Sequence, residues 1–186
     1  NMTFDGNEVF VDKIKVKKPL YWVFSELNGS KDTVKILSDL NKCYPFAETE
    51  IEKNVQKALG IENEKLIAKA TKAIESGDAE QVGSLMVEAQ NMFDSMVAPA
   101  SPKELAAPQL HKVLNDENIK KYTYGAKGVG SQGDGSVQFL AKDEQSQAEL
   151  IKYIKDEYNM DGFTLTLKPE KKVRKAIIPV AGFGTR

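Results

Sequence analysis

The sequence predicts an α+β domain in which an antiparallel sheet packs against helices. Three observations carry this prediction. Short apolar, β-branched runs stand near the start and near the end of the chain, and a long stretch with helical periodicity separates them. The last third then reads as strand, helix and strand. Runs of strands and helices in this order favour a mixed fold over an all-parallel one.

Composition narrows the class of protein. The chain has 186 residues, 41% of them hydrophobic and 28% charged, which is ordinary for a soluble globular domain. A net charge of −1 provides no broad field for nucleic acid or an anionic membrane, so neither is expected as a partner. No apolar run approaches the roughly 18 residues of a membrane span. One cysteine, Cys43, and one histidine, His111, exclude an internal disulfide and a Cys/His zinc site within this chain. We expect a cytoplasmic protein.

The N-terminal quarter predicts strands followed by a helix. Residues 2–16 read as two short strands around an Asp5-Gly6-Asn7 turn, and residues 20–27 (LYWVFSEL) as a central strand. A helix is predicted over residues 33–43, with Ser30 or Asp32 as its N-cap.

Residues 48–96 have the periodicity of helices. The strongest helix is predicted after Gly77, with Asp78 as N-cap and Gln81 three residues later. Its apolar positions keep the 3.6-residue period, so we interpret Met92 and Met96 as core residues.

Beyond this stretch the chain breaks and returns to short elements. Ser101 and Pro102 predict the N-cap and first residue of a helix that runs to about residue 114. His111 has no acid, cysteine or second histidine near it in the sequence, which favours a surface or packing role over catalysis. Asp143 is predicted to cap a helix that ends near residue 158, and residues 163–167 (FTLTL) form the last strand.

A glycine-rich stretch, GAKGVGSQGDGS at residues 125–136, joins two predicted strands. Glycine permits positive φ and close approach to a ligand, and successive free N–H groups in such a turn bind anions. Lys127, Ser131, Gln132 and Ser136 add polar groups. The stretch lacks the lysine and hydroxyl ending of a Walker loop and does not open a helix. An anion site and a loose hairpin connection both remain open from spacing alone.

These features together resemble the C-terminal domain of the GHMP kinases, the family of galactokinase, homoserine kinase, mevalonate kinase and phosphomevalonate kinase. The stretch is similar to the family's third motif, of the type G-A-K/R-x-[ST]-G-x-G-x-G-G, and LYWVFSELNGSKDTVKIL resembles its early strand–loop–helix. The resemblance covers residues 1–168 and implies a ferredoxin-like βαββαβ core with a helical insert. It also implies ATP and Mg²⁺ as cofactors and a sugar or sugar phosphate as partner. The implied substrate- or phosphate-binding residues are Gly125, Lys127, Gly128, Gly130, Ser131, Gln132, Gly133, Asp134, Gly135 and Ser136.

The chain departs from the family pattern in two ways. Ser131, Gln132 and Asp134 replace small residues, and the Asp134 carboxylate would repel a phosphate, which favours a sugar-hydroxyl or shaping role for the loop. No stretch resembles the family's P-x-G-x-G-S-S-A loop or its catalytic aspartate, which belong to an N-terminal domain. We therefore expect no catalytic residue, no metal ligand and no tightly bound cofactor in this chain, and a missing N-terminal kinase domain as its partner.

Residues 169–186 form a charged linker followed by AIIPVAGFGTR, an apolar run and a glycine turn. The stretch resembles the start of sugar-1-phosphate nucleotidyltransferases, A-I-[IL]-P-x-A-G-x-G-[ST]-R, particularly the UTP–glucose-1-phosphate uridylyltransferase kind. The resemblance implies a fused transferase domain that uses UTP or another nucleoside triphosphate with Mg²⁺. The implied nucleotide-binding residues are Ala181, Gly182, Gly184, Thr185 and Arg186. An edge strand with a flexible tail is the simpler interpretation.

Two hypotheses follow. In the first, a GHMP-type kinase makes a sugar 1-phosphate and a fused nucleotidyltransferase converts it to a nucleotide sugar, with this chain inactive alone. The sugar stays open among galactose, glucuronate, fucose and a heptose. In the second, the chain is a non-catalytic ligand-binding or dimerisation module whose glycine loop holds an anion. A complete nucleotidyltransferase is excluded by length, because only its signature is present.

Overall fold

The central element is a four-stranded antiparallel sheet. The computed structural model describes residues 2–170, and the sheet has the order β4-β5-β3-β6. Its strands are β3 (Leu20–Glu26), β4 (Thr123–Gly128), β5 (Ser136–Ala141) and β6 (Gly162–Leu167). Read in chain order, the second, third, first and fourth strands lie side by side, which is the ferredoxin-like arrangement. The predicted α+β class with an antiparallel sheet is confirmed, and β3 is an interior strand as predicted.

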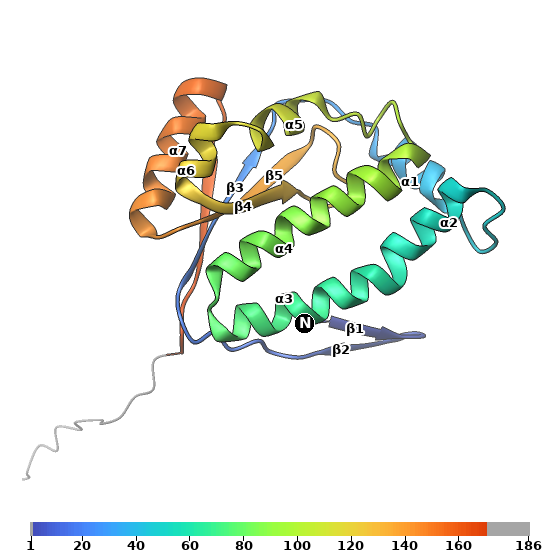
Figure 1. Cartoon of the computed structure of the whole chain (residues 1–186), viewed down its shortest axis with the longest axis horizontal. Coiled ribbons are helices and arrows are strands. Elements are labelled where there is room, and N and C mark those ends of the chain that lie inside the picture. The colour runs from blue at the N-terminus through green and yellow to red at the C-terminus, as the bar shows by residue number, and fades with distance from the viewer. Residues whose placement is uncertain (1, 171–186) are drawn as a thin grey trace, which may run out of the picture.

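Helices fill the long connection between β3 and β4 and the short one between β5 and β6 (Figure 1). The first group comprises α1 (Thr33–Asn41), α2 (Glu50–Lys57), α3 (Asn63–Ser76), α4 (Ala79–Met92), α5 (Pro108–Leu114) and α6 (Glu117–Tyr122), with π-helical turns at Ala58–Glu62 and Phe93–Val97. The second connection is α7 (Glu144–Tyr158). Within residues 2–170, none of the helices has both the length and the apolar character needed to cross a membrane.

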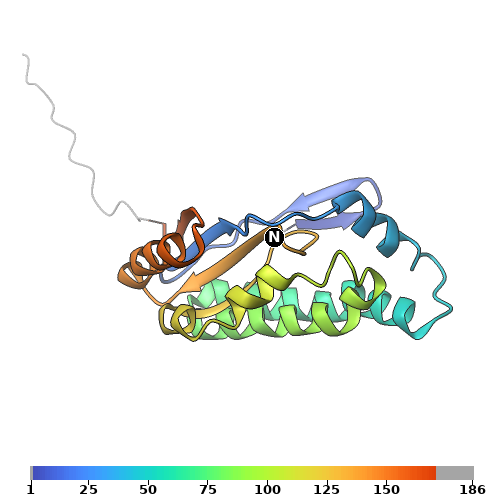
Figure 2. The same cartoon turned by 90° about the horizontal axis from the view of Figure 1, so that it is seen from above.

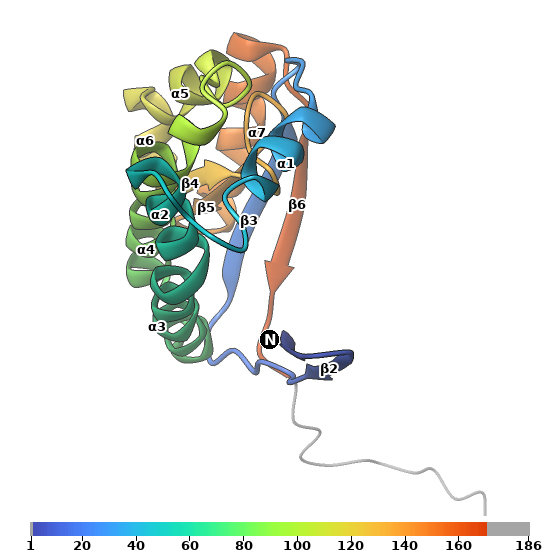
Figure 3. The ribbon, with the colours of Figure 1, turned by 90° about the vertical axis from the view of Figure 1, so that its right-hand side faces the viewer.

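The N-terminal strands stand apart from this sheet. β1 (Met2–Asp5) and β2 (Glu8–Val11) pair with each other in a separate hairpin, as the Asp5-Gly6-Asn7 turn predicts. Figure 3 shows the hairpin beyond the end of β6.

The two faces of the sheet are covered by different helices. Alternation along β3 places Leu20 and Trp22 in one apolar cluster with residues of α3 and α4, including Leu85. Val23 points to the other face, where it packs with residues of α5, α6 and α7, including Leu110. Figure 2 shows α3 and α4 as a layer along one side of the strands. The ferredoxin-like core thus has α5–α7 on one face, and the helical insert supplies the cover of the other.

Three predicted helix starts are confirmed. Asp32 accepts a hydrogen bond from the backbone N–H of Lys35 at the start of α1, and Asp78 accepts one from Gln81 at the start of α4. Asp143 does the same for α7. Each carboxylate satisfies a helix N–H that lacks an internal partner, which is why these residues mark the starts so reliably.

The helix predicted from Ser101 was placed wrongly. α5 begins at Pro108, which takes the first helical position that we assigned to Pro102. Ala107 precedes it in the left-handed region, at φ 46°, so the chain turns there. Ser101 instead donates its hydroxyl to Asp39 Oδ2 at 2.9 Å and is buried. The Ser101 side chain therefore bonds a distant residue and does not cap a helix.

Helix α4 lies directly against strand β4 through two glycines. A Cβ built on Gly125 would lie 2.2 Å from the backbone oxygen of Gly83, and one built on Gly83 would lie 2.5 Å from the backbone carbon of Tyr124. Both contacts are with backbone, which cannot rotate away. The helix and strand therefore approach this closely only because both positions are glycine.

Candidate functional site

The glycine loop is shorter than predicted. Gly125 and Gly128 belong to β4 and Ser136 opens β5, so the connection is residues 129–135. Gln132 N–H donates to the Val129 carbonyl at 3.1 Å, which closes a tight turn at the tip. Residues 125–128, the first four of the predicted loop, therefore belong to β4, because they pair with β5 in the sheet.

The tip of the loop has an unusual backbone. Gly130, Gln132 and Gly133 have φ values of 63°, 59° and 67°. Gly130 is exposed and has open space beside its Cα, whereas Gln132, Gly133 and Asp134 are buried. The accessible part of the loop is therefore Gly130 and its neighbour Ser131. Left-handed residues in a turn can direct consecutive N–H groups to one side, the arrangement that binds anions.

A lysine that the sequence analysis missed lies across this loop. Lys31 Nζ donates to Ser131 Oγ at 3.1 Å and to the Gln132 carbonyl at 2.8 Å. Partial burial lowers the pKa of Lys31. The aliphatic part of its side chain passes so close to Gly135 that a Cβ there would lie 2.6 Å from Lys31 Cε. The sequence signal was weak, because Lys31 simply follows the Asn28-Gly29-Ser30 turn, 100 positions before Ser131.

Asp134 shapes the loop from beneath. The residue is buried, and its Oδ1 accepts a hydrogen bond from the Leu110 N–H at 2.9 Å. This bond caps the start of α5, where Ala107 has no side-chain oxygen to do so. A Cβ on Gly29 would lie 2.6 Å from Asp134 Cβ, so the two loops are pressed together. The shaping role expected for this residue stays a prediction.

Two other predicted residues lie away from the loop tip. Gly125 packs on α4, as described above, and Lys127 lines a small cavity between α3 and α4. Lys127 Nζ donates to the Gly128 carbonyl at 2.8 Å, and burial lowers the pKa of this lysine. The positive charge beside the tip is therefore Lys31, not Lys127.

Gln132 carries an unsatisfied acceptor at the base of the loop. Its Oε1 is buried and has no hydrogen-bond partner among the described residues. A Cβ on Gly128 would lie 2.8 Å from this atom, so a larger residue at 128 would displace the amide. A buried acceptor without a partner costs about 1–3 kcal/mol.

A charged cleft of about 330 Å³ adjoins the loop. It lies between the start of α1 and residues 101–104, and the Glu104 side chain accepts a hydrogen bond from Asp32 N–H at 3.1 Å. Asp39 pairs with Lys35 and Lys42 and accepts from Ser101, and these hydrogen bonds hold its pKa well below the ordinary range. The Glu104 carbonyl lies against Gly133, so the cleft and loop are contiguous.

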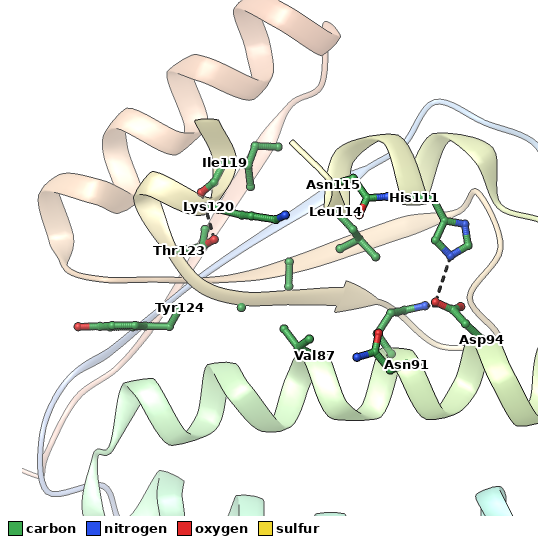
Figure 4. Close-up of a pocket in the computed structure, with 13 residues that line it drawn as sticks. Val87, Asn91, Asp94, His111, Leu114, Asn115, Ile119, Lys120, Thr123 and Tyr124 are labelled. Carbon is green, nitrogen blue, oxygen red and sulfur yellow. Dashed lines mark hydrogen bonds and ion pairs between the residues drawn. The ribbon is translucent and has the colours of Figure 1, made fainter. Parts of the chain in front are cut away.

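A chain of hydrogen bonds connects His111 to the start of the loop. His111 Nε2 lies 3.1 Å from Asp94 Oδ2, a contact drawn in Figure 4. Asp94 Oδ1 accepts from Gln90 Nε2 at 2.8 Å, and Gln90 Oε1 accepts from Gly128 N–H at 2.8 Å. Asp94, the acid partner of His111, is 17 positions away in the chain, so it is not among the sequence neighbours of the histidine.

The pKa of His111 gives a direct test of this contact. Burial lowers it, but the hydrogen bond and charge of Asp94, with the carbonyls of Ala106 and Ala107, outweigh burial and raise it above 6.5. We expect an NMR titration of the ring to give this raised pKa and Asp94→Asn to lower it, while the exposed Asp156→Asn leaves it unchanged. Protonated His111, paired with Asp94, stabilises the folded state. This stabilisation is complete below the pKa that His111 has in the unfolded chain, and it is lost as pH rises through the higher pKa that His111 has in the folded state. An unchanged pKa in Asp94→Asn would contradict the contact.

No protein-family model and no curated protein sequence matches the chain. Several solved structures do match the chain in fold. L. major mevalonate kinase in complex with R-mevalonate aligns with a TM-score of 0.65 and 16% identity, over 92% of this chain and 49% of that one. Streptococcus pneumoniae phosphomevalonate kinase gives 0.60 and 12%, over 85% and 44%. Lactococcus lactis galactokinase complexed with galactose gives 0.54 and 10%, over 88% and 48%.

These comparisons concern the fold. The chain spans about half the length of each of these kinases. The predicted nucleotide-binding residues Ala181, Gly182, Gly184, Thr185 and Arg186 lie outside the described residues. Within residues 2–170, no three His, Cys, Asp or Glu side chains gather to hold a metal ion. Over its described part, the chain has a fold similar to that of GHMP-type kinases.

Proposed function

We propose that residues 1–168 are the C-terminal part of an ATP-dependent, GHMP-type sugar kinase that converts a sugar to its 1-phosphate, as a galactokinase does. The observation that carries this proposal is the glycine loop at residues 129–135, set in a fold similar to mevalonate kinase and galactokinase structures. This chain is one wall of the active site, and the catalytic base and ATP-binding loop come from a further domain. The chain alone is inactive, and the whole protein works in the cytoplasm.

The residues around the loop suit an oxyanion or a sugar hydroxyl. Gly130 and Ser131 are accessible at the tip, and Lys31 supplies a positive charge beside them. Charge-assisted hydrogen bonds from an ammonium and from backbone N–H groups are strong toward phosphate. The Asp134 carboxylate is buried beneath the tip and accepts from Leu110 N–H, so the charged side chain hydrogen-bonded to the tip is Lys31. When bound, ATP would supply the transferred phosphoryl group, and Mg²⁺ would arrive on its phosphates.

We further propose that residues 169–186 are a linker and the first strand and loop of a nucleotidyltransferase domain. This part of the proposal rests on the motif A-I-I-P-V-A-G-F-G-T-R, in which Gly182, Gly184 and Arg186 occupy the signature positions. Arginine suits bidentate contact with a triphosphate. A kinase that produces a sugar 1-phosphate and a transferase that consumes it are chemically consecutive, which supports their fusion.

An assay of a longer protein that contains this chain and both neighbouring domains tests the proposal. With ATP and Mg²⁺, we expect ADP release that depends on one of galactose, glucuronate, fucose or a heptose, with the sugar 1-phosphate as product. Addition of UTP or GTP should then yield a nucleotide sugar and pyrophosphate. If none of these sugars causes ADP release, the assignment as a sugar kinase is refuted. If the sugar 1-phosphate accumulates and neither UTP nor GTP converts it to a nucleotide sugar, the assignment of the transferase is refuted.

A further inference from the structure

A further cavity lies between α4, α5, α6 and strand β4 (Figure 4). Its volume is about 460 Å³, within the range of about 300–1,000 Å³ that small-molecule sites occupy. None of residues 129–135 lines it, so it is distinct from the glycine loop. The kinase proposal above assigns it no role.

The lining combines an apolar wall with free polar groups. Val87, Leu114 and the buried Ile119 supply the apolar wall. Asn91 and Asn115 line its exposed rim, and within residues 2–170 their side-chain amides make no hydrogen bond to protein. An amide offers both a donor and an acceptor, which suits hydroxyl groups on a ligand with a short carbon skeleton.

The charges of the lining favour an anion. Among the described residues that line it, Asp94 carries the one carboxylate, and that group is already bonded to His111 and Gln90. Lys120 extends from α6 toward α5 in Figure 4. Its ammonium pairs with Glu117 at 2.7 Å, but the Glu117 side chain is 80% exposed. Exposed ion pairs of this kind contribute little to stability, so the Lys120 ammonium can leave Glu117 and bind a ligand instead.

The edge of β4 adds backbone groups. Among residues 2–170, only one side of β4 is paired in the sheet, and on the other side Gly128 N–H donates to Gln90. Because strand residues alternate in direction, the N–H and C=O groups of Ala126 point to that same edge. Ala126 also lines the cavity, so this edge of β4 runs along its wall.

We propose that this cavity binds a small hydroxylated organic anion, held by Lys120 at its charged group and by Asn91, Asn115 and the Ala126 backbone at its hydroxyls. The anionic group is a phosphate monoester or a carboxylate, since both offer oxygens to an ammonium. The carbon skeleton packs on Val87 and Leu114. The proposal holds whether or not the longer protein is a kinase, because it concerns a different surface.

Titration of the ¹⁵N-labelled 186-residue chain with glycerol 3-phosphate and, separately, glycerate tests this proposal and separates the two anionic groups. We expect saturable movement of the amide resonances of Asn115, Lys120 and Ala126 with at least one of them. Glycerol, which has the hydroxyls without the anion, should bind at least roughly tenfold more weakly, as the loss of one charge-assisted hydrogen bond implies.

Two variants make the result specific. Lys120→Gln should weaken binding roughly tenfold. Lys121→Gln, which removes the neighbouring exposed charge outside the cavity, should leave binding unchanged. The proposal is overturned if neither anion moves the cavity amides, if glycerol binds equally well, or if both variants behave alike. Movement confined to residues 129–133 would also overturn it, because the anion would then occupy the glycine loop.

Discussion

Gly125→Ala is expected to destabilise the chain by about 3 kcal/mol, near the upper end of overpacking penalties. The added methyl group would lie 2.2 Å from the Gly83 oxygen and 2.7 Å from the Gly83 carbon. Because these are backbone atoms of α4, either the helix must move away from β4 or the strand must leave its register. Both movements expose the apolar cluster that contains Trp22, Leu85 and Leu140.

Urea denaturation followed by the fluorescence of Trp22 measures this loss, since Trp22 is the chain's single tryptophan and is buried. Gly130→Ala is the matched control. Its methyl group would meet nothing within 4 Å, and only the left-handed φ of 63° costs energy, about 1 kcal/mol. Equal losses in the two variants would contradict the close α4–β4 contact.

Asp134→Ala is expected to cost about 2 kcal/mol and to disorder the glycine loop. The substitution leaves the buried Leu110 N–H without an acceptor, and a buried donor that loses its partner costs roughly this amount. It also removes the hydrogen bond that ties the end of the loop to the start of α5, so residues 129–133 lose an anchor. In the longer protein, we expect sugar-dependent ADP release to fall at least tenfold.

The comparison for Asp134 is Asp143→Ala, which removes the capping carboxylate of α7 at an exposed position. Water can replace that acceptor, so we expect a smaller loss of stability and unchanged ADP release. Hydrogen exchange at residues 129–133 reports on the loop directly. If exchange there is as slow in Asp134→Ala as in the unmodified chain, Asp134 does not hold the loop.

Local chemistry in the sequence predicted most of the fold. Asp32, Asp78 and Asp143 each supply a carboxylate where a helix begins, and no distant residue is needed to satisfy those N–H groups. The strands at residues 20–26 and 162–167 followed in the same way from β-branched and aromatic runs. The predicted start of α5 was wrong, since Ser101 does not cap a helix but bonds Asp39, 62 positions away in the chain.

The candidate site was less predictable for the same reason. The glycine spacing identified the loop, but the packing demands on Gly125 and Gly133 come from Gly83 and Glu104 on other elements. Lys31 reaches the loop from a turn 100 residues earlier, and Asp94 reaches His111 from a different helix. No local pattern encodes such pairings, because each depends on how the helical insert folds back on the sheet.

The central claim is that the glycine loop forms one wall of a kinase active site. A crystal structure of the longer protein with its sugar and a non-hydrolysable ATP analogue tests it most directly. We predict that at least one backbone N–H of residues 129–133, or Lys31 Nζ, lies within about 3.2 Å of a phosphate or sugar oxygen. A structure with both ligands bound and no loop atom or Lys31 atom in contact with either would contradict the claim.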